Sequence, residues 1–117
     1  MIQEAYVSFE TAKLLKEKGF DGEFHKHYWG YEEGREFLTE GSFNSEYDYP
    51  APTQQVTMRW LREVHSIFLS IQQHIDMSYV WYIYADGVPR GCDRESHNNS
   101  YEDACEAAIK YCLTNLI

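Results

Sequence analysis

The hydrophobic pattern of residues 51–85 changes its period once, and this change constrains the fold more than any other feature. Ala51-Pro52-Thr53 predicts the start of a helix, because the fixed φ of proline suits a first helical position. The apolar residues that follow lie on one helical face, namely Val56, Trp60, Leu61 and Val64. After Ser66 the period changes to two, which is the period of a strand: Ile67, Leu69, Ile71 and Ile75 alternate with Phe68, Ser70, Gln72 and His74. The segment therefore predicts a helix followed directly by extended chain.

A second strand is predicted at Tyr79–Ala85, after a turn at Asp76-Met77-Ser78. Every position of this strand is apolar or aromatic. Its side chains alternate, so one face receives Tyr79, Trp81 and Ile83, and the other receives Val80, Tyr82 and Tyr84. A strand that is apolar on both faces is either internal to a sheet or displays aromatic residues on an open surface. We expect Tyr79–Ala85 to be an internal strand.

The remaining chain supplies two more helices and a hairpin. Ser8 predicts the N-cap of a helix from Phe9 to Lys18, and Ser100 predicts the N-cap of a helix that runs to the C-terminus. The C-terminal helix has a continuous apolar stripe through Ala104, Ala108 and Cys112. The expected hairpin pairs residues 24–31 with residues 36–39, while residues 41–50 and 86–99 are expected to be loops.

These elements predict an α+β fold with the order α-β-β-α-β-β-α. Small hairpins are marginal alone, so the strands are expected to join one antiparallel sheet covered by helices in two layers. With 117 residues, the chain is expected to form a single domain over positions 1–117.

The charge balance disfavours some classes of partner. The chain has 10 Lys and Arg residues against 19 Asp and Glu residues, for a formal net charge of −9. Direct nucleic-acid binding and adsorption to an anionic membrane are therefore disfavoured, whereas a basic protein partner is favoured. No apolar run reaches the ~20 residues that span a bilayer, and residues 1–5 do not resemble a signal peptide. The sequence predicts a cytoplasmic protein.

The three cysteines are expected to be free thiols. Cys105 and Cys112 lie seven positions apart on one helix, about 10.5 Å along its axis. A disulfide requires Cα atoms within about 7 Å, so these two cannot pair with each other. Both fall on the apolar stripe and are expected to be buried, while Cys92 is expected in an exposed loop.

Histidines and carboxylates give the candidates for a metal site or for acid–base chemistry. His25 and His27 are spaced to share one side of a strand, with His97 or Cys92 as a third ligand, but zinc sites usually contain two close Cys/His pairs. Solvated surface histidines are the favoured interpretation, so no metal or other cofactor is predicted. Asp93, Glu95 and His97 are likewise interpreted as solvated groups, and no catalytic residue is assigned.

Aromatic residues give the candidates for a binding surface. Ten tyrosines and three tryptophans are too many for the core of so small a domain. Tyrosine combines apolar area with a hydroxyl that tolerates water, and it is enriched at protein interfaces. For the four aromatic residues of the predicted strand 79–85, two alternatives stay open: they pack at the boundary of sheet and helix, or they form a protein interface. The four residues are Tyr79, Trp81, Tyr82 and Tyr84.

Three segments carry a family resemblance, and they are residues 6–21, residues 49–65 and residues 100–104. They begin with Tyr6-Val7-Ser8-Phe9, Tyr49-Pro50-Ala51-Pro52 and Ser100-Tyr101-Glu102-Asp103-Ala104. Together they resemble a family of short uncharacterised proteins from Bacteroides-type gut bacteria and their prophages and mobile elements. The resemblance implies no activity, cofactor or catalytic residue.

The sequence favours a non-catalytic protein-binding accessory or regulatory protein of a bacterial mobile element. Its partner would be a basic protein or a second copy of the chain. One alternative is an acidic nucleic-acid mimic that inhibits a DNA-binding enzyme. The other alternative is a small metal-assisted hydrolase using His25, His27, Asp93, Glu95 and His97.

Overall fold

The computed structural model describes residues 3–29, 37–41 and 48–117, without the side chains of residues 94–96. The elements follow the order α-β-β-β-α-β-β-β-α, and the predicted α+β class is confirmed. The chain divides into two compact units, Met1–Thr57 (unit 1) and Met58–Ile117 (unit 2). Each unit packs a helix against its own antiparallel sheet, so the expectation of one common sheet is wrong.

Unit 1 contains helix α1 (Phe9–Glu17) and the strands β1 (Lys26–Trp29), β2 (Phe37–Glu40) and β3 (Asp48–Pro50). The predicted hairpin is confirmed, because β1 pairs with β2, while its turn lies outside the described residues. Strand β3 pairs with the other edge of β1, at the end of the segment expected to be a loop. That pairing was not visible in the sequence, because three residues are too few to show a period.

Helix α1 is positioned as its sequence predicts. The Ser8 side chain accepts a hydrogen bond from the Thr11 backbone N–H at 3.2 Å, and Gly19 follows the helix with φ +78°. Phe9, buried on the inner side of α1, contacts the rings of Tyr28 and Tyr49 edge-on at 5.6 and 5.5 Å. These aromatic contacts join helix and sheet in the core of unit 1.

Helix α2 (Gln54–His65) crosses the boundary between the two units. It begins later than expected, because Thr53 acts as the cap: its side chain accepts from the Val56 N–H at 3.2 Å. Pro52 therefore precedes the helix. Trp60 and Leu61 are buried as predicted, but the prediction is wrong for Val64, which is 55% exposed in the last turn of the helix.

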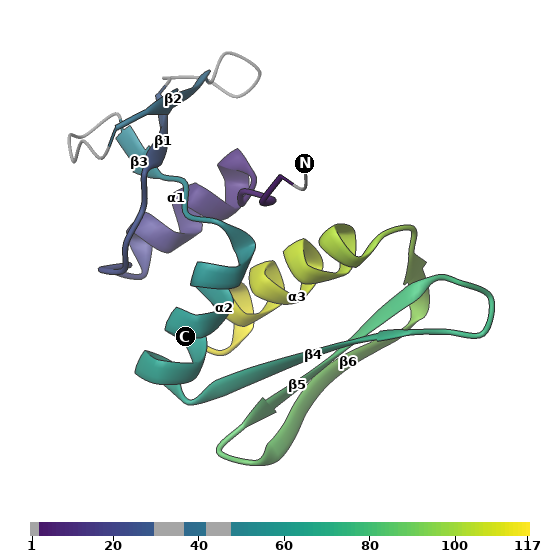
Figure 1. Ribbon diagram of the computed structural model, residues 1–117. Coiled ribbons are helices and arrows are strands. Elements are labelled where there is room, and N and C mark those ends of the chain that lie inside the picture. Colours follow the sequence, from purple (N-terminus) through teal and green to yellow (C-terminus); the bar gives the residue numbers. More distant parts are fainter. Residues whose placement is uncertain (1–2, 30–36, 42–47) are drawn as a thin grey trace. The chain divides into compact units, whose positions relative to one another are not determined.

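Unit 2 is built on a sheet with the strand order β4-β5-β6 (Figure 1). The strands are β4 (Ile67–Gln73), β5 (Tyr79–Ala85) and β6 (Val88–Asn98). The prediction that β5 is an internal strand is confirmed by its pairing with both neighbours. The predicted loop at residues 86–99 is wrong, because most of it forms β6. A tight turn joins β5 to β6, with positive φ angles at Asp86 (52°) and Gly87 (79°).

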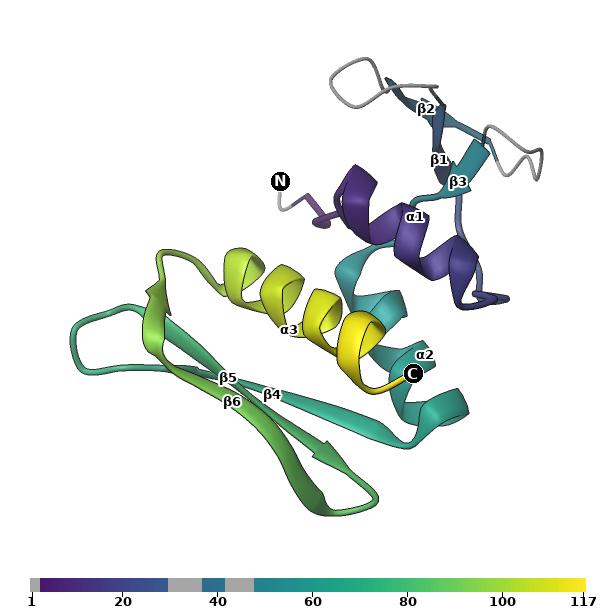
Figure 2. The ribbon, with the colours of Figure 1, turned by 180° about the vertical axis from the view of Figure 1, so that it is seen from behind.

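Helix α3 (Tyr101–Asn115) lies along one face of this sheet, and Figure 2 shows the same arrangement from behind. Its predicted stripe is confirmed: Ala104, Ala108 and Cys112 are fully buried. Gly91 on β6 permits close packing, since a Cβ there would lie 2.9 Å from the ring of Tyr111. No described element of unit 2 covers the opposite face of the sheet in either view.

Candidate functional site

Two of the four aromatic candidates on β5 point toward helix α3. Trp81 is only 6% exposed, and its ring lies 5.2 Å from that of Tyr111. Tyr79 is half-buried and meets the ring of Tyr101 edge-on at 6.3 Å. These contacts place Tyr79 and Trp81 at the boundary between helix and sheet.

The other two candidates, Tyr82 and Tyr84, lie on the face of the sheet opposite α3. Tyr84 is directly across from Phe68 of β4, and Tyr82 lies between Ser70 of β4 and Cys92 of β6. Directly paired residues of neighbouring strands share a face. We call this surface the open face, defined by Phe68, Ser70, Tyr82, Tyr84 and Cys92.

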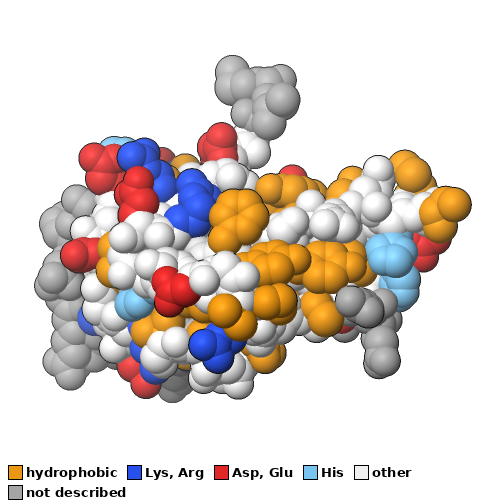
Figure 3. Space-filling model, turned by 90° about the horizontal axis from the view of Figure 1, so that it is seen from below, with side chains coloured by type: hydrophobic (Ala, Val, Ile, Leu, Met, Phe, Trp, Pro, Cys, Tyr) orange, Lys and Arg blue, Asp and Glu red, His pale blue; other side chains and the backbone are white. Residues whose placement is uncertain are grey.

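The open face is mostly apolar, and its five defining residues are all at least partly accessible. Phe68 is 52% exposed, Cys92 is exposed, and both tyrosines are partly exposed. In Figure 3 a band of hydrophobic side chains runs across this side of unit 2 and ends beside histidine side chains, toward the β4–β5 turn. Aromatic side chains are enriched at protein interaction surfaces, and neighbouring exposed apolar side chains often mark one.

The sequence analysis did not single out Phe68 as a surface residue. The signal was present, since the alternation from Ile67 to Ile75 places Phe68 on the side away from the core. Pairing of β4 with β5 then brings Phe68 beside Tyr84.

The two histidines of unit 1, His25 and His27, lie in different environments. His27 is 5% exposed, and its Nδ1 donates to the carbonyl oxygen of Gly41 at 2.8 Å. Its Nε2 lies 3.0 Å from the hydroxyl of Thr39 and 3.7 Å from the carboxylate of Asp48. His25 is exposed and lies just before β1. Both ring nitrogens of His27 thus make polar contacts within unit 1. They do not form a site together with His25.

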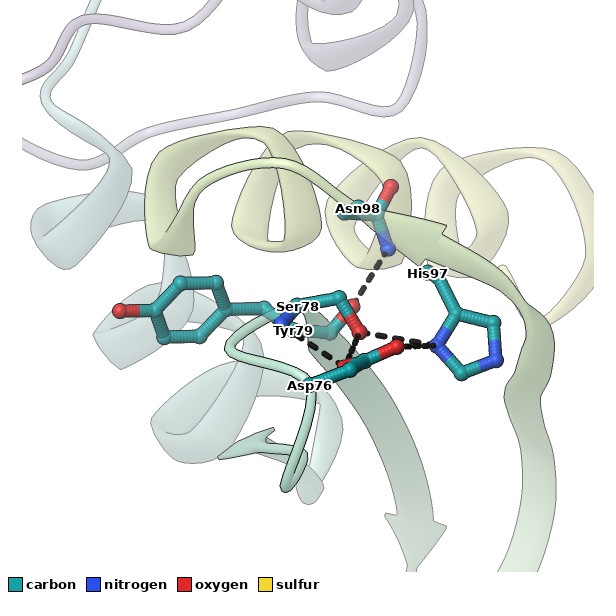
Figure 4. A network of polar contacts seen from close by, with 5 residues as sticks. All are labelled: Asp76, Ser78, Tyr79, His97 and Asn98. Atoms are coloured by element: carbon teal, nitrogen blue, oxygen red, sulfur yellow. Dashed lines mark hydrogen bonds and ion pairs between the residues drawn. The ribbon is translucent and has the colours of Figure 1, made fainter.

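His97 belongs to unit 2, where it joins a polar network with the β4–β5 turn (Figure 4). Its Nδ1 lies 2.8 Å from Ser78 Oγ and 3.4 Å from a carboxylate oxygen of Asp76. Asp76 accepts hydrogen bonds from the backbone N–H of Ser78 at 3.0 Å and from its hydroxyl at 2.6 Å. These bonds from Ser78 lower the pKa of Asp76 below its usual value.

The network has the residue types of a Ser-His-Asp triad but not its geometry. In a triad the acid and the serine contact opposite nitrogens of the imidazole. Here Ser78 and Asp76 both approach Nδ1 of His97, and Ser78 donates directly to Asp76. His74 lies beside the network, with its ring centroid 5.2 Å from that of His97. The arrangement therefore does not provide a serine activated by a histidine in the manner of a triad.

The other predicted polar candidates lie along β6. Asp93 is paired with Trp81, and Cys92 is exposed as expected but lies on a strand rather than in a loop. The side chain of Glu95 lies outside the described residues. His25 and His27 belong to unit 1, whereas Asp93 and His97 belong to unit 2.

Comparison of the chain with protein-family models, with curated proteins and with solved structures finds no match. Within residues 3–29, 37–41 and 48–117, no helix is long and apolar enough to cross a membrane.

Proposed function

We propose that this chain is a non-catalytic protein-binding protein that contacts a basic protein partner through the open face. The observation that carries the proposal is the row of partly exposed aromatic side chains on neighbouring strands, Phe68, Tyr84 and Tyr82. A partner placed on this row would remove apolar area from water, which is the main favourable term in protein association.

The net charge favours a basic partner over a second copy of the chain. Two copies that each carry a formal charge of −9 repel each other, whereas a basic protein is attracted over the range set by the ionic strength. The family resemblance of residues 6–21, 49–65 and 100–104 supports an accessory or regulatory role in a bacterial mobile element.

An affinity capture with matched variants tests the proposal. The wild-type chain, Phe68→Ser and Phe37→Ser serve as baits in a lysate of the source organism at physiological salt. Phe37 is a suitable control, because it is 59% exposed on β2 of unit 1 and lies outside the open face. The proposal expects a basic protein that the wild type and Phe37→Ser retain and that Phe68→Ser loses. Identical captures by all three baits would contradict it.

A second experiment maps the contact on the purified complex. Cys92 is exposed on the open face beside Tyr82, whereas Cys105 and Cys112 are buried. A saturating concentration of the partner is expected to slow the alkylation of Cys92 by a maleimide at least about tenfold. An unchanged rate would place the partner elsewhere. Sedimentation of the chain alone checks self-association. If the wild type is a dimer and Phe68→Ser is a monomer, the open face binds a second copy of the chain rather than a basic partner.

The two alternative functions draw less support from the described residues. Mimicry of nucleic acid requires carboxylates arrayed along a face, and the open face carries aromatic residues instead. The hydrolase requires His27 as a ligand, but the ring nitrogens of His27 already contact Gly41 and Thr39.

A further inference from the structure

Three side chains that can ligate a metal meet where the β4–β5 turn lies beside the end of β6. His74 and Asp76 come from the turn, and His97 comes from β6. One potential ligand atom from each residue can be chosen so that all three lie within 4.8 Å of one another. Of the three histidines considered as metal ligands in the sequence analysis, only His97 belongs to this cluster.

The separation is close to what one bound ion requires. Zinc binds imidazole nitrogen and carboxylate oxygen at about 2.0–2.2 Å, so two ligand atoms on a tetrahedral ion lie about 3.4 Å apart. Asp76 and His97 have side chains that are 56% and 41% exposed, so each has room to rotate. Side-chain rotations that bring the ligand atoms closer by at most about 1.4 Å would close the site.

Hydrogen bonds around the cluster hold the β4–β5 turn beside the end of β6. Ser78 donates to one carboxylate oxygen of Asp76 from its backbone N–H and from its hydroxyl, and the hydroxyl also lies 2.8 Å from Nδ1 of His97, so Ser78 links the two side chains. The side-chain amide of Asn98 donates to the carbonyl oxygen of Tyr79 at 3.1 Å, which ties the end of β6 to the start of β5 (Figure 4). The backbone N–H of His74 donates a hydrogen bond to the carbonyl oxygen of Ser78 at 2.7 Å, which closes the turn. Such supporting contacts commonly orient metal ligands.

We propose that His74, Asp76 and His97 form a binding site for a divalent transition-metal ion of the zinc class, which clamps the β4–β5 turn to the end of β6. Two imidazoles and one carboxylate suit Zn²⁺, Ni²⁺ or Cu²⁺, whereas Mg²⁺ and Ca²⁺ prefer sites made of oxygen ligands. The remaining coordination positions face solvent and take water. This site is separate from the partner contact proposed for the open face.

Calorimetric titration with ZnCl₂ tests the proposal on an untagged chain. All proteins carry Cys92→Ser, which removes the exposed thiol as a competing ligand. We expect one equivalent of zinc to bind, and His74→Gln, Asp76→Asn and His97→Gln each to weaken binding at least about tenfold. MgCl₂ at the same concentrations should not compete.

Two substitutions outside the cluster serve as matched controls. His25→Gln removes an exposed histidine of unit 1, and Asp86→Asn removes an exposed carboxylate at the β5–β6 turn. Asparagine tolerates the positive φ of 52° at position 86. Both controls should bind zinc with the affinity of the reference protein.

A footprinting measurement without ligand substitutions gives an independent readout. Diethyl pyrocarbonate modifies accessible imidazoles, so zinc should shield His74 and His97 while His25 continues to react. The proposal is overturned if the His74→Gln/His97→Gln variant binds zinc as tightly as the reference, or if the reference binds more weakly than about 1 mM. Equal modification of all three histidines with and without zinc would overturn it as well.

Discussion

The three cysteines of this chain differ in their surroundings, and at the scale of single residues this difference sets their reactivity. Burial raises the pKa of Cys105 to about 11 and that of Cys112 to about 12. Cys92 is exposed on β6. Because the thiolate is the reactive form, the two buried thiols should be inert in the folded chain.

Alkylation at pH 7.5 followed by peptide mass spectrometry measures this difference. A pKa of about 12 instead of 9.0 lowers the thiolate fraction of Cys112 about a thousandfold, and burial slows the reagent further. We expect iodoacetamide to label Cys92 in the native protein, and all three cysteines in denaturant. Native labelling of Cys112 at a rate near that of Cys92 would contradict the packing of α3.

Trp81 presents a buried polar atom without a partner. Its indole N–H is buried and finds no hydrogen-bond acceptor among the described residues, which is costly for a buried donor. Trp81→Phe removes this donor while keeping a ring against Tyr111, so we expect the free energy of unfolding to change by less than about 1.5 kcal/mol.

Trp81→Ala provides the comparison, because it removes the ring itself. It should cost about 3–5 kcal/mol, as other aromatic truncations in cores do. Urea denaturation followed by circular dichroism measures both variants. Equal losses for the two substitutions would contradict the view that the ring, rather than its N–H, contributes the stability.

At the scale of elements, the strongest local patterns predicted the structure well. Helix α3 and strands β4 and β5 were predictable because their apolar residues repeat with one clear period. The N-caps at Ser8 and Ser100 were also predicted correctly, because serine is a favoured N-cap residue. Each side chain accepts a hydrogen bond from the backbone N–H three residues later. Ile75 was wrongly extended into the strand and is fully exposed in the turn.

Strand β6 was missed because its residues are mostly polar. Its register with β5 shifts twice, and an edge strand with one solvated side shows little hydrophobic period. One signal was available: Asp86-Gly87 after an apolar strand is a typical hairpin turn. The turn with positive φ at both residues is what the structure contains.

The packing of α3 on its sheet gives a prediction for the element as a whole. Ala108 is fully buried in the stripe that faces the sheet. Ala108→Glu would place an unpaired carboxylate there and should lower the free energy of unfolding by about 3 kcal/mol or more. Thermal denaturation measures the loss.

Thr114→Glu is the matched control, since residue 114 is exposed on the same helix. Its effect should stay within about 1 kcal/mol, because the new carboxylate meets only the negative end of the helix dipole at an exposed position. A melting temperature of Ala108→Glu within a degree or two of the parent would mean that the stripe faces water.

At the scale of the whole molecule, the candidate sites show what sequence reasoning can and cannot supply. Tyr82 and Tyr84 were identified from composition and alternation within one strand. The cluster of His74, Asp76 and His97 was not, because it depends on the pairing of β5 with β6, which brings residues 19 or more positions apart together. Nonlocal pairing of this kind leaves no local pattern in the chain.

The net charge leads to a prediction about nucleic acid. Non-specific DNA affinity comes from neutralising phosphates with Lys and Arg, and the formal charge of −9 opposes that contact. We expect no change in the fluorescence anisotropy of a labelled duplex up to about 100 μM protein at about 0.15 M salt. A basic DNA-binding protein on the same probe is the positive control. Salt-sensitive binding in the micromolar range would contradict the prediction.

The distribution of tryptophans gives the chain a built-in optical probe. Trp29 is 43% exposed in unit 1, whereas Trp60 and Trp81 are 5% and 6% exposed in unit 2. An indole in water emits at longer wavelength than one in an apolar core, so Trp29→Phe leaves emission from unit 2 alone. The red shift of that emission on heating can then be compared with the loss of helical signal from the entire chain. Coinciding transitions would show that both halves melt together, whereas separate midpoints would show that each half melts on its own.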